Sequence, residues 1–202
     1  MEYKKTRNDL LKLRRLRALV DYGETVLKKK MVLLTTIILS DLLNYRKNLE
    51  LDKEVVKSTM DQIDFALSFD GVQSILSASN MITANYSLDF KKDNLIGTVV
   101  PSFILKNMFI KRGYGKFTTS FRVSNSSEKF GKLIAELIED ANAYLRIKKL
   151  AEGTYKTKVV YNSINKKLIP SLDGQQKAIS EFLDSSERDE NFNVRELAEE
   201  NY

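Results

Sequence analysis

The carboxylates that could act as an acid–base pair lie in two short clusters. Each cluster holds three acidic residues within five positions: Glu136, Glu139 and Asp140 in one, and Glu187, Asp189 and Glu190 in the other. Catalysis by such a pair needs a cleft that shifts the pKa of one carboxyl group away from the other. On an exposed helix these groups are solvated charges, so we expect no catalysis from either cluster.

Nucleophilic and metal chemistry is limited by composition. The chain has no His and no Cys in 202 residues. It therefore has no thiol nucleophile, no disulfide, no His/Cys metal site and no His to activate its Ser and Thr hydroxyls. The basic run Lys28–Lys30 is better interpreted as a docking charge than as a Schiff-base site. We expect no cofactor and no metal.

One glycine-containing segment resembles a phosphate loop only superficially. Gly113-Tyr-Gly115 lacks the further glycine, the lysine and the following helix that a nucleotide loop requires. A plain turn is the better interpretation.

Charge is unevenly distributed along the chain, whose net charge is +6. Residues 1–17 carry seven basic and two acidic side chains, and residues 181–202 carry eight acidic and two basic ones. A basic start can indicate nucleic-acid binding. The favoured interpretation is that the basic start and the acidic end lie side by side within the chain.

Long helical patterns at both ends must position all of these groups. Apolar residues recur every three, four or seven positions from about Thr6 to Asp70, and again from about Glu128 to Glu200. The opening stretch uses Leu10, Leu13, Val20, Leu27, Met31, Leu34, Ile38, Leu42, Tyr45 and Leu49; the closing stretch uses Leu133, Leu137, Ala141, Tyr144, Ala151, Tyr155, Val159, Leu168, Leu172, Ile179, Leu183 and Leu197. Because this repeat is nearer 3.5 than 3.67, we expect a mainly α fold, a long antiparallel left-handed coiled coil.

The middle of the chain has a different character. Gly71 is a plausible helix stop, and Ser124–Glu128 is a cluster of helix-capping residue types. Between them, Ile96–Leu105, Met108–Gly115 and Phe117–Val123 predict short strands or a hairpin. We therefore divide one structural unit into 1–70, a small middle head at 71–127, and 128–202. Six aromatic residues suggest a small core or a partner face: Phe65, Phe69, Phe103, Phe109, Phe117 and Phe121.

Two residues interrupt the helical patterns. Gly23 lies inside the first and Pro170 inside the second, where proline should bend the helix. With equal rise in both helices, position i should face roughly position 190 − i. Gly23 then falls close to Pro170, either as a paired bend and close approach or by coincidence. The same register leaves about the last ten residues as a single-helix overhang.

The most apolar run, Met31–Leu43, contains Asp41 and is shorter than the roughly 20 residues that a membrane span needs. We therefore expect a buried helix face there rather than a membrane span. Tyr3–Arg17 is densely charged and contains no apolar run, so we expect no secretory signal and a soluble protein.

Several segments in a fixed order form one pattern along the chain. It starts at Thr6–Leu16, Gly23 and Val26–Lys30, and continues through Ile96–Pro101 and Tyr161–Asn165 to Ile169-Pro-Ser-Leu172 and the segment Leu183–Phe192 with its Leu-Asp and Glu-Arg pairs. With these segments the chain resembles the D subunit of archaeal (A-type) and vacuolar-type rotary ATPases. Lys5 replaces the family's proline, Glu24 its histidine, and Ser163-Ile-Asn165 its Ala-Leu-Glu, as in a divergent member.

The resemblance implies a non-enzymatic central stalk, or rotor axle, of a proton- or sodium-translocating rotary ATP synthase. Such an axle transmits torque between the membrane rotor and the catalytic ring. The implied partners are the catalytic and nucleotide-binding ring subunits, the F subunit, and a funnel-shaped coupling subunit. The implied location is peripheral, at the cytoplasmic face of the cell membrane. The residues expected to bear on the ring are Arg7, Arg14, Arg15, Glu187, Arg188 and Phe192.

Two other interpretations remain open from the sequence. One is a coiled-coil adaptor without a rotary role, and the other is a basic helical protein that binds nucleic acid. Co-purification with ATPase subunits would separate the first from an axle, and salt-dependent retention on DNA or RNA would support the second.

Overall fold

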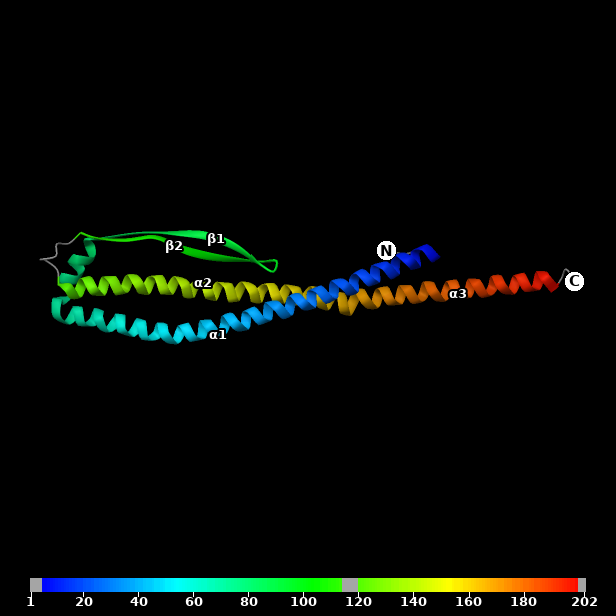
Figure 1. Cartoon of the computed structure of the whole chain (residues 1–202), viewed down its shortest axis with the longest axis horizontal. Helices are drawn as coiled ribbons and strands as arrows, with labels where there is room; N and C mark the ends of the chain where they lie inside the picture. Colours follow the sequence, from blue (N-terminus) through cyan, green and yellow to red (C-terminus); the bar gives the residue numbers. More distant parts are fainter. Residues whose placement is uncertain (1–4, 114–119, 200–202) are drawn as a thin grey trace. The chain divides into compact units, whose positions relative to one another are not determined.

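The computed structural model describes residues 5–113 and 120–199, and two long helical stretches enclose a β-hairpin in sequence (Figure 1). The elements in chain order are α1 (Arg7–Asn80), β1 (Ile82–Leu95), β2 (Thr98–Arg112), α2 (Phe121–Ser163), a π-helix (Ile164–Leu168) and α3 (Ile169–Glu199). These residues form two compact units. The terminal unit combines the chain up to Leu33 with the chain from Thr154 onward, and the central unit is Leu34–Gly153.

Local sequence explains where the helices begin and break. Thr6 caps α1, because its Oγ1 accepts a hydrogen bond from the Asp9 N–H at 3.2 Å. Ser120 caps α2 in the same way, with its Oγ accepting from the Arg122 N–H at 3.2 Å. Gly71 interrupts α1 at φ 73° and ψ 157°, a conformation that favours glycine, and a further helical stretch runs on to Asn80.

The core of the terminal unit is a narrow apolar seam. Leu13 of α1 packs with Leu172 and Ile179 of α3, and all three are buried. Half-buried leucines and valine extend this seam: Leu10, Leu16, Val20 and Leu183. Arg17 pairs with Asp173, with Nε and Oδ1 2.6 Å apart, which is the partner that the expected register gives. The predicted antiparallel pairing is thus confirmed within this unit.

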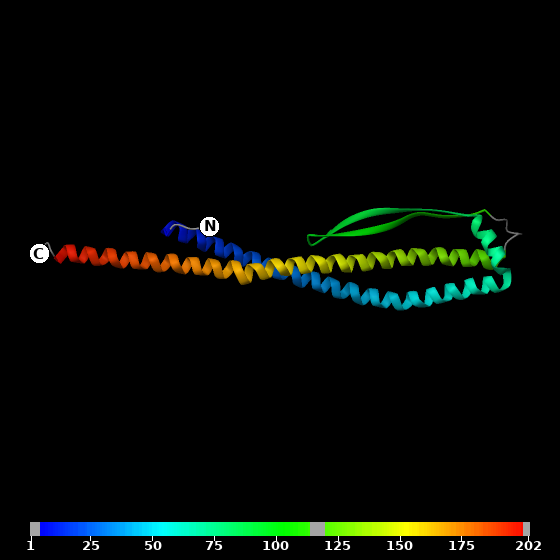
Figure 2. The same cartoon turned by 180° about the vertical axis from the view of Figure 1, so that it is seen from behind.

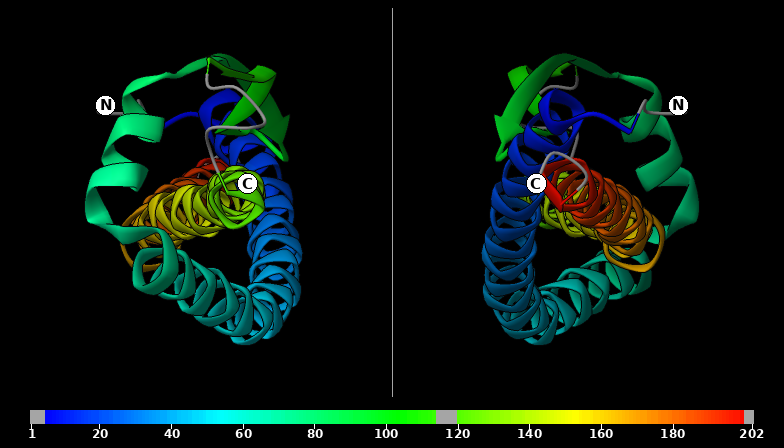
Figure 3. Two further views of the ribbon diagram at one scale, coloured as in Figure 1. Left: turned by 90° about the vertical axis from the view of Figure 1, so that its left-hand side faces the viewer. Right: turned by 90° about the vertical axis from the view of Figure 1, so that its right-hand side faces the viewer.

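The central unit has its own core, to which the hairpin contributes. Leu34 of α1, Leu150 of α2 and Val100 of β2 are buried together, and Ile37, Ile38 and Leu95 pack around them. Asp41 and Arg146 form an ion pair across the two helices, with Oδ2 and Nε 2.8 Å apart. Seen from both sides and along the helices, α2 lies between the hairpin and the later part of α1 (Figures 2 and 3).

The hairpin closes through a two-residue turn, Ile96-Gly97. Both residues have positive φ, 51° and 70°. A two-residue hairpin turn needs such angles, because they match the twist of the two strands. Isoleucine is unusual at such an angle, since its branched side chain crowds the backbone. The strands pair antiparallel from Leu95 opposite Thr98 to Ile82 opposite Arg112, with one irregularity between Asn85 and Ser87.

Two contacts bind the hairpin to α2. The side-chain amide of Asn142 donates to the Phe103 carbonyl at 2.7 Å and accepts from the Phe103 N–H at 2.8 Å, so it pairs with β2 as a strand would. At Gly153 a Cβ would lie 2.5 Å from the Thr98 Oγ1, and only glycine allows this approach. The hairpin is therefore part of the central unit.

The predicted mainly α fold, with strands in the middle, is confirmed, but several boundaries differ. The strands are 14 and 15 residues long rather than short, and β1 begins at Ile82, well before the first predicted strand. Helix α2 begins at Phe121, so Ser124–Ser127 are inside the helix and the strand predicted at Phe117–Val123 is wrong for Phe121–Val123. Phe117 lies outside the described residues, as do Tyr114 and Gly115 of the expected turn. The handedness of the coiled coil stays a prediction.

The burial pattern also corrects the predicted seam. Leu13, Leu34, Leu133, Leu172 and Ile179 are buried as expected. Nine other predicted seam residues are exposed: Leu42, Leu49, Leu137, Ala141, Tyr144, Ala151, Tyr155, Val159 and Leu168. Along α2 and α3 the hairpin contacts and the π-helix change which face of the helix is buried, and the predicted seam included neither feature.

Replacing Ile38 by Asp should destabilise the central unit by roughly 2–4 kcal/mol, because it puts a charge beside Leu34 and Leu150. Thermal melting followed by circular dichroism measures this. Leu39→Asp is the matched control, since Leu39 is 56% exposed and should tolerate the charge with little change. Equal melting midpoints for the two variants would contradict the packing of Ile38 against this core.

Candidate partner-binding surfaces

The basic start of the chain lies against its acidic end in the terminal unit. Arg7 forms an ion pair with Glu187, and Arg17 contacts both Asp173 and Asp21. The hydrogen bonds that Arg17 donates to Asp173 and to Asp21 raise the pKa of Arg17, the one to Asp173 having the larger effect. The intramolecular pairing favoured from the charge pattern is therefore confirmed.

These ion pairs are exposed. The side chains of Arg7 and Glu187 are 75% and 51% accessible. Pairs of this kind contribute about 0–1 kcal/mol each, because water screens them and ordering two long side chains costs entropy. They can exchange partners at little cost, which suits a surface that meets other chains.

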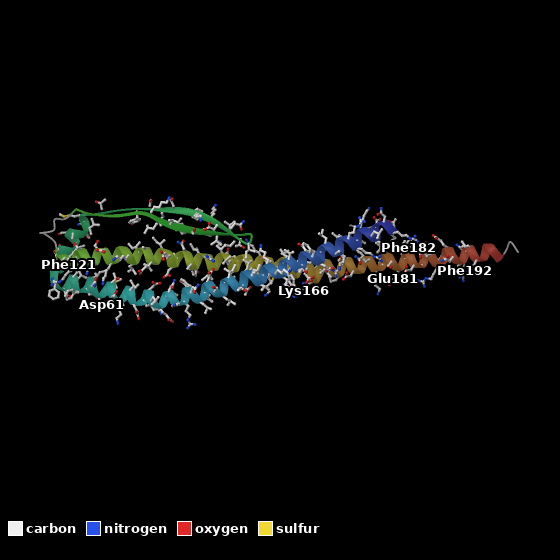
Figure 4. All side chains as sticks on the ribbon, in the orientation of Figure 1. Asp61, Phe121, Lys166, Glu181, Phe182 and Phe192 are labelled. Atoms are coloured by element: carbon white, nitrogen blue, oxygen red, sulfur yellow. The ribbon has the colours of Figure 1, made fainter. Side chains whose placement is uncertain are left out.

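The helix α3 continues beyond its ion pair with the first residue of α1. Helix α1 begins at Arg7, which pairs with Glu187, and α3 runs on to Glu199. Phe192 lies on this continuation and is 67% exposed (Figure 4). The predicted single-helix overhang is thus present in the terminal unit.

Of the residues expected to bear on a ring, the structure joins Arg7 and Glu187 directly. Arg188 donates from Nε to the Asp184 carbonyl of its own helix at 3.1 Å. Arg14 and Arg15 are exposed on α1. The sequence did not indicate Lys5, whose Nζ lies 4.7 Å from the centre of the Phe182 ring. A cation near an aromatic residue far along the chain has no local sequence signal.

Gly23 and Pro170 behave differently from each other. Gly23 lies within a continuous α1, and a Cβ built there would meet no atom within 4 Å. Nothing at this position therefore requires glycine for a close helix approach. Pro170 is the second residue of α3 and lies two positions after Leu168, the last residue of the π-helix.

A second apolar face of α1 has no counterpart in the predicted seam. It consists of Leu19, Tyr22, Val26 and Leu33, which are 65%, 70%, 45% and 54% exposed. Their spacing of three, four and seven places them on one side of the helix. Adjacent exposed apolar residues of this kind mark surfaces that other proteins cover.

An aromatic cluster occupies the far end of the central unit. The rings of Phe65 and Phe69 are 4.6 Å apart, and the Arg122 guanidinium lies 5.2 and 4.4 Å from their centres. Phe65, Phe69 and Phe121, the residue before Arg122, are more than half exposed. Phe121 is labelled in Figure 4. Phe103 instead pairs with Phe90 on the hairpin at 5.6 Å. The side chain of Phe109 lies outside the described residues.

The carboxylate cluster near Asp140 is part of the helix interface. Asp140 of α2 interacts with Asp52 of α1. Burial, then Asp52, Glu136 and Glu139, raise the pKa of Asp140 to about 6. A raised pKa alone does not make a catalytic group, and the two hollows found among the described residues, each about 290 Å³, are lined by other residues.

Neither hollow combines the groups that a reaction needs. One is almost wholly apolar and lies between α1, α2 and the start of β1, beside Ile63, Val123 and Phe130. The other lies under the hairpin and contains the Asp41–Arg146 pair. No group of three or more potential metal ligands occurs in residues 5–113 and 120–199. In the same residues no helix has the length and hydropathy to cross a membrane.

The described residues form paired helices with a docked hairpin and carry exposed apolar and aromatic surfaces. These features are typical of a protein that works by assembling with other chains. A family model described as the D subunit of ATP synthase matches residues 9–198. The chain is 29% identical to the A-type ATP synthase D subunit of Archaeoglobus fulgidus, over 97% of this chain and 96% of that one. It is 27% identical to the A-type ATP synthase D subunit of Methanosarcina mazei, over 97% and 95%.

The chain therefore belongs to the ATP synthase D-subunit family, the non-catalytic stalk subunits of rotary ATPases. It is one component of a membrane-associated complex.

Asp140→Asn should stabilise the central unit at neutral pH by on the order of 1 kcal/mol, allowing for solvent screening. The raised pKa means that the folded state holds this proton more tightly than the unfolded state, so stability falls as pH rises from about 4 to 6. The variant should gain over the parent above pH 6 and lose that gain below pH 4. Melting curves across pH 3–8 measure it, and Asp61→Asn, at an exposed site on α1, is the control.

Proposed function

We propose that this chain is the central stalk component that transmits torque between the membrane rotor and the catalytic ring of a proton- or sodium-translocating rotary ATP synthase. The observation that carries the proposal is the continuation of α3 beyond its ion pair with the start of α1, in a chain of the D-subunit family. A single exposed helix with charged groups and an aromatic residue is a narrow element that a surrounding ring can hold.

The bearing surface on the ring consists of Arg7, Arg14, Arg15, Glu187, Arg188 and Phe192. The exposure of these residues and the weak Arg7–Glu187 pair support this assignment. Each exposed ion pair contributes about 0–1 kcal/mol. A shaft held by several such contacts can pass from one angular position to the next without a deep energy minimum at any of them.

Other partners contact other surfaces. The second apolar face of α1 and the aromatic cluster of Phe65, Phe69 and Arg122 support binding of two further proteins, which we propose to be the F subunit and the coupling subunit to the membrane rotor. In this assembly the chain is peripheral, at the cytoplasmic face of the membrane, and rotation presents its asymmetric surface to each catalytic site in turn.

The nucleic-acid interpretation loses its main support because the basic start is engaged by acidic residues of the same chain. The adaptor interpretation differs from an axle because an adaptor has no rotary role and does not join the ring. Co-expression with the remaining subunits, followed by purification on a tagged ring subunit, separates the two. A chain that never joins the ring is an adaptor.

Deleting residues 185–202 should weaken retention of the chain in the ring and lower ATP-driven ion pumping. It removes the continuation of α3 but leaves the seam of Leu13, Leu172 and Ile179. Reconstituted complexes assayed for ATP hydrolysis and pumping measure the effect, and binding of the F subunit measures whether the rest of the chain is intact.

Arg188→Ala is the matched control for that deletion. It removes one exposed charge and should change coupling by less than about 1 kcal/mol in free-energy terms. If the truncated chain assembles and pumps like the full-length chain, the end of α3 is not a bearing surface.

A further inference from the structure

The helix that faces α1 contains one turn of a different kind. Ile164–Leu168 form a π-helix, and the Ile169 N–H donates to the Ile164 carbonyl five residues earlier. The flanking residues keep α-helical angles, −65° and −41° at Ser163 and −59° and −54° at Ile169. A π-turn adds one residue to a helix without ending it. Lys166, which it contains, is labelled in Figure 4.

Burial along this helix shows where one extra residue is needed. Leu172 and Ile179, which pack against α1, are seven positions apart, whereas Thr157 and Leu172 are fifteen apart. Two heptads account for fourteen of those positions. On the opposite helix, Leu13 and Val20 keep the spacing of seven. The helix facing α1 thus has a surplus of one residue between Thr157 and Leu172, and the π-helix lies within that interval.

Helix geometry connects the two observations. Each residue of an α-helix turns the following residues by about 100°. A surplus residue in regular α-helix would rotate Leu172 and Ile179 away from α1. A π-turn is wider and turns less per residue, so one such turn takes up the surplus and returns Leu172 to the seam.

We propose that the π-helix accommodates the surplus residue of the heptad pattern. It thereby determines which face of α3 is turned toward α1, which is the rotational phase of α3, and Pro170 fixes the position of the π-helix along the chain. Proline has no N–H to donate to the Lys166 carbonyl, and its ring would clash with that carbonyl in a regular helix. The surplus therefore stays immediately before Pro170. The direction in which Arg188 and Phe192 point follows from this phase, whatever partner they meet.

Two deletions test the proposal. One removes Lys166, inside the π-helix, together with Pro170→Ala, so that a regular helix can form; the other removes Lys177, an exposed lysine of α3 between Leu172 and Ile179, and keeps Pro170, so that the surplus residue stays in place. Both remove one lysine. Arg7→Cys and Glu187→Cys, in a chain with no native cysteine, allow a short thiol cross-linker to report whether these ion-paired positions remain adjacent.

Deleting Lys166 should leave a regular helix, retain the cross-link, and keep or raise the melting midpoint. Deleting Lys177 should rotate Ile179 and Leu183 out of the seam, abolish the cross-link and lower the midpoint by several degrees. Pro170→Ala alone should retain the cross-link, because the surplus residue is still present.

Two results would overturn the proposal. If both deletions lower the midpoint equally and abolish the cross-link, the helix holds no surplus residue. If Pro170→Ala alone abolishes the cross-link, proline rather than the heptad surplus maintains the π-turn.

Discussion

Two helices lying side by side bury only one narrow apolar face of each, and the packing of this structure depends on those faces. In the terminal unit they amount to little more than Leu13, Leu172 and Ile179 with their half-buried neighbours. In the central unit the hairpin adds Val100 to Leu34 and Leu150. With so little apolar surface buried per residue, a single misplaced side chain in the seam removes a large share of the packing. The phase of each helix therefore matters more here than in a globular core.

Electrostatics adds alignment rather than much stability. The Arg17–Asp173 and Asp41–Arg146 pairs join the two helices in their respective units. Both are partly exposed, so each contributes modestly to the free energy of unfolding. Opposite charges at these positions nevertheless disfavour a sliding of one helix along the other, because a shift separates both pairs. The Asp52–Asp140 contact acts in the opposite direction, since two carboxyl groups meet there and, together with burial, this raises the pKa of Asp140.

The sequence predicted those features that depend on repetition. The spacing of apolar residues indicated two long helices, and equal rise gave the Arg17–Asp173 register. It did not predict β1, although Tyr86, Leu88 and Phe90 alternate with polar residues. This short alternation begins soon after a segment that is helical up to Asn80, and no glycine or proline separates the two in the sequence. The sequence also did not predict the contacts Asn142–Phe103 and Arg122–Phe69. Each joins residues far apart in the chain through one side chain, and such contacts leave no local sequence pattern. The cap predicted at Ser124–Ser127 is wrong because capping residue types are also tolerated inside a helix held by tertiary contacts.

The Asn142 amide has a consequence for the chain before it meets its partners. A two-stranded sheet has two open edges, and each offers unpaired backbone groups to any strand of another molecule. At Phe103 the backbone N–H and carbonyl are already hydrogen-bonded to the Asn142 amide, in the way that a neighbouring strand would bond them. A strand of another molecule therefore cannot pair with these two groups. Asn142 thus closes part of the β2 edge to strand addition, so a newly made chain that awaits assembly has less template for pairing with copies of itself.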